Sequence, residues 1–381
     1  MEAFAQLVAL PSVSSVDPDF DQSNRGVIEL LANWFEDLGF SCELQLVSSN
    51  PDKLNLVACH GEGDGGLVLS GHTDTVPFNE GLWQQDPFSL KEVDNRLYGL
   101  GSTDMKSFFP VILATLEKIE LAKLNRPLIV LATSDEESTM AGAKALQACG
   151  RKFGRHALIG EPTGLQPIRM HKGMLVESIR LLGQSGHSSN PLLGNNALEG
   201  MHDVIAGLMK LRREFQDGNH NPDFEIPYPT MNFASIHGGD NANRICGDCE
   251  LTIDLRLMPG MDIDQSRASI RRSVMQSIDG RGLTVEFDPV FTGMPAMQTD
   301  RDAEIVRLAE KLTGNESTSV AFGTEAPYFN SMGMETLILG PGDIDQAHQA
   351  NEYLETKRIE PMVDILRQVI ENFCIVNEEN D

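Results

Sequence analysis

The chain has 381 residues, of which 41% are hydrophobic and 23% charged, and this length and composition favour two globular domains. Its formal net charge of −26 at pH 7 argues against nucleic acid or an anionic membrane as a partner, because both would be repelled. No apolar run is long enough to span a membrane, and residues 1–20 lack the basic start of a secretory signal, so we expect a cytoplasmic protein.

The first part of the chain alternates predicted helices and strands. Helical spacing of apolar residues predicts helices at residues 26–39, 107–119 and 141–148. Short apolar runs predict strands at residues 54–59, 67–70, 127–133 and 156–159. Strands and helices in such alternation are typical of an α/β domain with a largely buried sheet.

The middle of the chain has a different order of elements. Strands are predicted at residues 174–182, 231–237, 249–257 and 283–287, and helices at 197–215 and 263–278. The order strand-helix-strand-strand-helix-strand is typical of a ferredoxin-like α+β unit. Helices predicted at 303–312 and 360–373 follow it. We therefore predict a discontinuous domain, residues 1–177 and 291–381, with a smaller domain, residues 178–290, inserted into it.

The six cysteines do not form a dense framework, which fits a reducing cytoplasm. Cys246 and Cys249 have the spacing of half a zinc site, but no second pair follows them. They run into a strand-like stretch at residues 250–255, so a structural role is favoured over metal binding.

His72 is the first candidate for chemistry. It follows the apolar run at residues 67–69, and Asp74 is placed to orient its imidazole through the second ring nitrogen, as metal-binding histidines require. The alternative is a structural histidine with satisfied hydrogen bonds.

Asp104 follows a Gly99-Leu100-Gly101 sequence. A phosphate-binding loop would need a third glycine where Asp104 stands, so a nucleotide site is only weakly indicated. Asp104 is instead a candidate metal ligand, and its alternative role is to cap the helix that follows.

Further carboxylates come after other predicted strands. Glu136 and Glu137 follow the run at 127–133, Glu161 follows the run at 156–159, and His348 follows a Gly-Pro-Gly loop. Open α/β sheets bind ligands at the carboxyl ends of their strands, and clustered carboxylates repel one another unless a cation neutralises them. Two histidines and three carboxylates suit Zn²⁺, Co²⁺ or Mn²⁺ better than Ca²⁺. The candidate ligands are His72, Asp104, Glu137, Glu161 and His348.

The chain resembles the M20 family of di-zinc aminoacylases and peptidases. The segments that carry the resemblance are residues 70–77, 98–106, 132–142, 160–172, 183–190, 237–249 and 340–355. The resemblance implies a zinc-peptidase-like catalytic domain with a mixed, mostly parallel central sheet. It also implies that the inserted ferredoxin-like domain is a lid and dimerisation domain. The protein is therefore expected to be a homodimer.

The resemblance also assigns roles to the candidate metal centre. It implies two divalent metal ions per subunit, Zn²⁺ with Co²⁺ as the alternative. His72 and Glu161 would complete one site and Glu137 and His348 the other. Asp104 would bridge both ions. Glu136 would be the general base, and Asp74 would assist catalysis beside His72.

Substrate contacts would come from four further residues. His187 resembles a histidine that reaches into the partner subunit's site, and Asn243 resembles a polar lid residue. Arg256 suits bidentate capture of a substrate α-carboxylate. Glu325 would pair with a side-chain ammonium. The alternative for each is an ordinary solvated surface position.

The resemblance implies hydrolysis of N²-acetyl-L-ornithine to L-ornithine and acetate, a step of bacterial arginine biosynthesis. One alternative is another amidohydrolase of the same family, acting on succinyl-diaminopimelate or on N-acyl-amino acids in general. The other is a non-catalytic dimeric binding protein with a decayed metal site.

Overall fold

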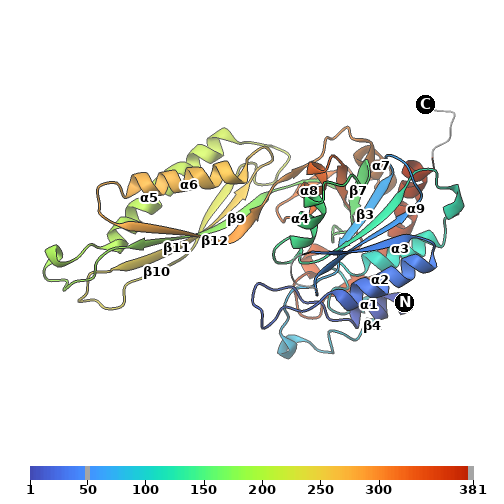
Figure 1. The fold of residues 1–381 in the computed structure, drawn as a ribbon, viewed down its shortest axis with the longest axis horizontal. Helices are drawn as coiled ribbons and strands as arrows, with labels where there is room; N and C mark the ends of the chain where they lie inside the picture. Colours follow the sequence, from blue (N-terminus) through green and yellow to red (C-terminus); the bar gives the residue numbers. More distant parts are fainter. Residues whose placement is uncertain (48–51, 376–381) are drawn as a thin grey trace. The chain divides into compact units, whose positions relative to one another are not determined.

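A mixed sheet lies at the centre of the first of two compact units (Figure 1). The computed structural model describes residues 1–47 and 52–375, so the last six residues of the predicted first domain lie outside the description. The first unit comprises Met1–Arg169, Gln298–Thr318 and Thr324–Asp381. The second comprises Met170–Met297 and Ser319–Gly323, and the predicted insertion at residues 178–290 lies within it.

The strands of the central sheet differ in direction. Their order is β1 (Ser41–Leu46), β2 (Leu54–His60), β6 (Leu128–Thr133), β3 (Leu67–His72), β7 (His156–Ile159), β15 (Glu335–Ile338), β8 (Ile168–His171) and β13 (Met297–Gln298), with β14 (Thr318–Val320) paired to β8. β6, β3, β7 and β15 run parallel, whereas β1, β2 and β8 are antiparallel to their neighbours. Every residue of β3, β6 and β7 is buried, as the unbroken apolar runs predicted.

Each helix of the first unit buries apolar side chains, and the helix at Phe108–Leu116 is buried on almost every side. These helices are α1 (Glu2–Val8), α2 (Arg25–Asp37), α3 (Phe108–Leu116), α4 (Ala141–Ala148), α7 (Glu304–Thr313), α8 (Ala326–Ser331) and α9 (Ile359–Cys374). Ile28 and Leu31 of α2 and Leu366 of α9 are fully buried in one core with Leu67 and Leu69 of β3. α9 packs on α3 and β3, and α4 packs on α8.

A small separate sheet joins two distant parts of the first unit. It consists of β4 (Lys91–Val93), β5 (Arg96–Tyr98) and β16 (Tyr353–Glu355), in the order β16-β5-β4. These strands are too short to give a periodic signal, and the sequence did not predict them. Single 3₁₀ turns lie at Glu80–Leu82, Leu121–Lys123, Pro191–Leu193, Ile344–Gln346 and Thr356–Arg358.

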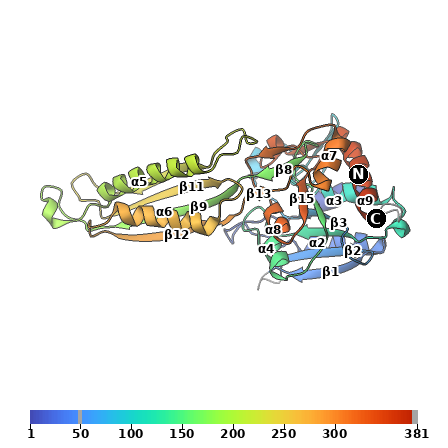
Figure 2. The ribbon, with the colours of Figure 1, turned by 90° about the horizontal axis from the view of Figure 1, so that it is seen from above.

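The second unit is an antiparallel sheet with two helices on one face (Figures 1 and 2). Its elements are β9 (Gly173–Leu182), α5 (Ala197–Gly218), β10 (Thr230–Gly238), β11 (Asp248–Leu257), α6 (Ile263–Ser277) and β12 (Thr284–Met294), and the sheet order is β10-β11-β9-β12. Burial alternates strictly along β11, where Leu251, Ile253 and Leu255 belong to the core with residues of α5 and α6. The predicted fold class, an α/β domain with a ferredoxin-like α+β domain, is confirmed.

None of the helices within residues 1–47 and 52–375 combines the length and apolar character needed to cross a membrane.

Candidate metal centre

Three neighbouring parallel strands deliver the predicted ligands to one edge of the central sheet. His72 is the last residue of β3, Glu136 and Glu137 follow β6, and Glu161 follows β7. β3 pairs in parallel with both β6 and β7, so the residues that follow these strands meet at the carboxyl edge. Asp104 reaches this edge from the loop between β5 and α3.

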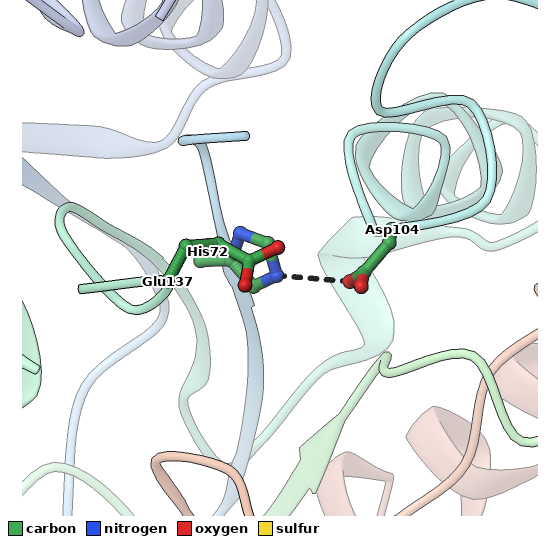
Figure 3. Close-up of side chains that lie close together, drawn as sticks. All are labelled: His72, Asp104 and Glu137. Atoms are coloured by element: carbon green, nitrogen blue, oxygen red, sulfur yellow. Dashed lines mark hydrogen bonds and ion pairs between the residues drawn. The ribbon is translucent and has the colours of Figure 1, made fainter. Parts of the chain in front are cut away.

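Asp104 lies between two histidines. Its Oδ1 is 3.1 Å from Nε2 of His72, and Figure 3 shows these two side chains facing each other. Its Oδ2 is 3.4 Å from Nε2 of His348. A carboxylate that offers a different oxygen to each imidazole is suited to bridge two cations.

The remaining carboxylates stand beside the same histidines. Oε1 of Glu137 is 3.0 Å from Nε2 of His348, and Oε2 of Glu161 is 4.0 Å from Nε2 of His72. Within the described part of the chain, Oε1 of Glu161 is buried without a hydrogen-bond partner. An unpaired buried carboxylate oxygen is costly in a protein interior, so this group fits a cation.

Ligand atoms within 4.8 Å of one another form two overlapping groups. The first is His72, Asp104 and Glu137, and the second is His72, Glu136 and Glu161. His72 belongs to both groups. The resemblance instead implies that His72 and Glu161 belong to one ion site and Glu137 and His348 to the other. His348 adds its contacts to Asp104 and Glu137 from outside these groups.

Asp74 supports two of the candidate ligands. Its backbone carbonyl accepts a hydrogen bond from Nδ1 of His72 at 3.0 Å, which leaves Nε2 free to bind a metal. Its carboxylate is farther from Nδ1, at 3.7 Å, and instead accepts the backbone N–H of Glu137 at 3.0 Å. Burial raises the pKa of this carboxyl to about 6, against the opposing charge of His72.

The electrostatics of the cluster favour added positive charge. Burial, followed by the charge of neighbouring Glu161, raises the pKa of Glu136 well above its usual range, and burial does the same for Glu161. Hydrogen bonds to carboxylates raise the pKa of His348 to about 10. Burial is the largest single influence on His72 and lowers its pKa, but the hydrogen bond to Asp104 and the charges of neighbouring carboxylates, Glu161 foremost, together raise the pKa well above its usual value. The site therefore holds either protons or divalent cations.

A strained turn positions Glu136 and Glu137. Asp135, the residue before them, has φ +57°, a left-handed conformation that few non-glycine residues adopt. Its Oδ1 accepts hydrogen bonds from Nζ of Lys53 at 2.7 Å and Oγ of Ser14 at 2.8 Å. Lys53 and Ser14 could not be predicted from the sequence, because they lie far from Asp135 along the chain and belong to no motif.

The loop of Asp104 is neither a phosphate-binding loop nor the cap of a helix. The alternative role of Asp104 as a helix cap does not hold, because α3 begins at Phe108 and residues 101–107 form turns before it. The Gly-x-Gly sequence holds a carboxylate of the chain itself, since Gly101 and Asp104 donate backbone N–H groups to Glu352. The role of Glu352 was not predicted from the sequence.

Glu325 is enclosed between β3 and β6. It is 1% exposed, and its two carboxylate oxygens accept hydrogen bonds from Oγ of Ser70 at 2.5 Å and Oγ1 of Thr133 at 2.8 Å. Burial raises the pKa of this carboxyl. Its contact with a substrate ammonium stays a prediction.

His187 and Asn243 lie on two paired loops of the second unit. His187 is exposed and forms an isolated β-bridge with Arg244. Its Nδ1 accepts the backbone N–H of Ser189 at 3.2 Å. The backbone carbonyl of Asn243 accepts the N–H of Ser188 at 3.0 Å.

Arg256 of β11 forms a fork with its own neighbour. Its Nε and Nη2 donate to the two carboxylate oxygens of Asp254 at 2.8 and 3.0 Å.

Cys246 and Cys249 are buried in the second unit's core, and neither candidate metal group of the described residues includes a cysteine. That these cysteines are structural stays a prediction.

An α/β sheet whose carboxyl edge gathers two histidines and several buried carboxylates has the architecture of a metal-dependent hydrolase. Comparison with known proteins agrees with this class. The sequence model of Peptidase family M20/M25/M40 matches residues 68–372, and the chain belongs to this family. The resemblance inferred from the sequence is thus confirmed.

Individual relatives cover nearly the whole chain. It is 50% identical over 377 residues to an acetylornithine deacetylase of Pectobacterium carotovorum, covering 98% of this chain and 97% of the relative. It is 48% identical over 371 residues to an acetylornithine deacetylase of Edwardsiella ictaluri, covering 97% of each. The crystal structure of a tripeptidase from Staphylococcus aureus has the same fold, with a TM-score of 0.76, 18% identity, and coverage of 97% of this chain and 96% of that one.

Proposed function

We propose that this chain is a two-metal deacetylase that hydrolyses N²-acetyl-L-ornithine to L-ornithine and acetate, in the cytoplasm, as a step of arginine biosynthesis. The observation that carries the proposal is the Asp104 carboxylate, which offers one oxygen to His72 and the other to His348. The choice of substrate is supported by the two deacetylases that align with the chain over nearly its full length.

The proposed centre holds two divalent ions per subunit. His72 and Glu161 would bind one, Glu137 and His348 the other, and Asp104 both. Imidazole nitrogens mixed with carboxylate oxygens favour Zn²⁺, with Co²⁺ as the alternative. When bound, such ions polarise an amide carbonyl and make an attacking water more acidic.

Glu136 would be the general base of the reaction. It lies with His72 and Glu161 in one group of potential ligand atoms, yet the proposed ligand assignment leaves its carboxylate free. Burial raises the pKa of Glu136, which makes its carboxylate a stronger base toward the proton of an attacking water. It would accept the proton of the attacking water and pass it to the leaving amine. Asp74 would hold His72 in the required orientation throughout.

His187 would stabilise the negative charge on the carbonyl oxygen. A backbone N–H can only donate, so Nδ1 of His187 is the acceptor and a neutral ring carries its proton on Nε2. Nε2–H is thus available as a donor to an oxyanion. We propose that it acts in the partner subunit's site, so that the working form is a homodimer and the second unit serves as lid and dimerisation domain.

Arg256, Asn243 and Glu325 would contact the substrate. Arg256 donates two hydrogen bonds to the carboxylate of Asp254. To bind substrate it would release Asp254 and donate the same pair of hydrogen bonds to the substrate α-carboxylate. Asn243 would add a polar contact from its loop. Glu325 would pair with the ornithine ammonium.

The assay that tests the function measures acetate and succinate release by the metal-loaded protein. N²-acetyl-L-ornithine, succinyl-diaminopimelate and N-acetylmethionine are offered separately at equal concentration. We expect the highest kcat/KM for acetylornithine. Preference for either of the other substrates would assign the chain another activity of the family, and no turnover of any of them by fully loaded protein would favour a binding protein.

The number of ions is tested by metal analysis of two variants. His72→Ala should weaken one site and leave about one ion per subunit, whereas Asp104→Ala should weaken both because its carboxylate bridges. Two tightly held ions in Asp104→Ala would contradict the bridging role.

A further inference from the structure

The carboxylate of Glu352 is enclosed by the loop that carries Asp104. Glu352 is 2% exposed. Its Oε1 accepts the backbone N–H groups of Thr103 at 2.7 Å and Asp104 at 3.0 Å, and its Oε2 accepts that of Gly101 at 2.9 Å. Neighbouring N–H groups that converge in this way form a nest, an arrangement that binds anions.

The small sheet places Glu352 at this loop. β16 pairs with β5 so that Tyr353 lies opposite Tyr98. The pairing continues one step further, where the backbone carbonyl of Glu352 accepts the N–H of Gly99 at 3.1 Å. Glu352 is thereby fixed beside residues 99–104, and its side chain turns into the loop.

The opposite side of the loop is fixed as well. Gly101 has φ +77°, and a Cβ at this position would come within 2.9 Å of Thr75. Lys106 is buried, and its Nζ donates to the backbone carbonyls of Leu10 at 2.7 Å and Leu7 at 3.4 Å. The loop is therefore held between Glu352 and the N-terminal part of the chain, with little room to shift.

We propose that Glu352 is a positioning residue for the metal centre, which holds the Asp104 side chain at the place where it bridges the two ions. The inference rests on the metal centre of the proposed function. The backbone N–H of Asp104 is bound to Glu352 while the carboxylate of the same residue faces His72 and His348. A displacement of the loop would move the carboxylate by a similar distance.

Glu352 also steadies His348, which stands four residues earlier on the same segment. The His348 side chain is 53% exposed, whereas Glu352 is almost fully enclosed. The buried anchor thus restrains the exposed end of the segment. Through this one carboxylate the structure couples a ligand on the loop of Asp104 to a ligand on the segment of His348.

Glu352→Gln tests the proposal because it keeps size and shape. The amide has one oxygen, so its NH₂ group would face at least one of the loop's N–H donors. We measure Zn²⁺ and Co²⁺ affinity, the visible absorption spectrum of the Co²⁺-loaded protein, and the melting temperature of the metal-free protein. We expect metal affinity to fall about 10- to 100-fold, the usual effect of losing a group that orients a ligand. The Co²⁺ spectrum should change because the ligand geometry changes.

Glu355→Gln is the matched control. Glu355 lies on β16, and its carboxylate pairs with Lys357 at 2.8 Å, away from the loop donors. It should bind both ions as the wild type does. Glu352→Asp, which keeps two acceptor oxygens on a shorter arm, should give an intermediate affinity, and it replaces Glu352→Gln if that variant does not fold.

Wild-type affinity and spectrum in the folded Glu352 variant would overturn the proposal, even if the melting temperature of the metal-free protein falls, because Glu352 would then be structural only. The wild-type protein separates this failure from a failure of the proposed function. If the wild type itself binds neither Zn²⁺ nor Co²⁺, the metal centre and the proposed function fail together.

Discussion

The two units use their sheets in opposite ways. In the first unit, β3 and β6 are buried along their whole length, and the polar residues stand where the strands end. In the second, β11 alternates between buried and partly exposed residues, so polar side chains such as Arg256 stand along the strand itself. The first sheet gathers side chains at one edge, whereas the second displays them over a surface and on its loops.

This difference predicts a division of labour. Ligands that meet at one edge from several strands hold a rigid centre, so substitutions of the ligands themselves should change metal content. Exposed residues on the loops of the second unit should change the rate while the ions stay bound.

The largest effect is expected from Glu136→Gln in the first unit. The amide cannot accept the proton of the attacking water, so kcat should fall about 10²–10⁴-fold, the usual contribution of a general base. Metal content should stay normal, because Glu136 is not one of the proposed ligands. Glu29→Gln, an exposed carboxylate on α2, is the control. A Glu136→Gln protein with normal metals and more than about a tenth of wild-type kcat would show that the base is elsewhere.

A slightly smaller effect is expected from His187→Ala in the second unit. Loss of the oxyanion donor should lower kcat about 10²–10³-fold while both ions stay bound. His202→Ala, an exposed histidine on α5 of the same unit, should leave kcat unchanged. Loss of metal in His187→Ala would remove the contrast between the units.

The same histidine allows a test of the shared site. Mixed dimers of His187→Ala and Glu136→Gln chains contain one site with both residues intact if His187 acts across the interface. Refolding equal amounts together should restore roughly a quarter of wild-type activity under random pairing. Chains that exchange subunits and yet stay inactive would place both residues in one chain's own site.

The affinity of the centre for its metal ions should rise with pH. The raised pKa values of His72 and His348, about 10 for the latter, mean that the metal-free site carries protons at neutral pH. Metal binding displaces these protons, so lower pH favours the metal-free form. Affinity should fall about tenfold per pH unit for each proton displaced. Calorimetry in buffers of different ionisation enthalpy counts the protons, and an affinity independent of pH would contradict a protonated metal-free site.

The smallest effect is expected from Glu325→Gln. The hydroxyls of Ser70 and Thr133 can rotate to accept from the amide, so the fold should persist. If Glu325 recognises the ornithine ammonium, KM should rise for acetylornithine more than for uncharged N-acetylmethionine. Equal changes for the two substrates would leave Glu325 with only its buried hydrogen bonds.

Most of the helices and strands could be predicted from the periodicity of apolar residues along the sequence. The apolar stripe of α2, the unbroken strands β3 and β6 and the alternation of β11 depend on local burial, which the sequence displays directly. The sequence did not predict β16, because its three residues are ordered by pairing with a strand far away in the chain. The same reason hid the small sheet that fixes Glu352.

The candidate ligands could be predicted because each follows a recognisable strand or loop motif. The groups that hold them could not. Lys53 reaches Asp135 and Glu352 reaches Asp104 across long sequence separations, and neither residue follows a predicted strand of the central sheet. The sequence does show a glycine at position 101. In the structure its left-handed backbone allows successive N–H groups to converge on an anion.

One titration tests the central claim that the sheet edge of the first unit is a two-metal deacetylase centre. Metal-free protein is titrated with Zn²⁺, and bound metal and acetate release from N²-acetyl-L-ornithine are measured at each step. We predict no release without metal and full activity once the sites defined by His72 and His348 are filled. Protein that binds its ions at these residues and still releases no acetate, or that releases acetate at full rate without metal, would contradict the account.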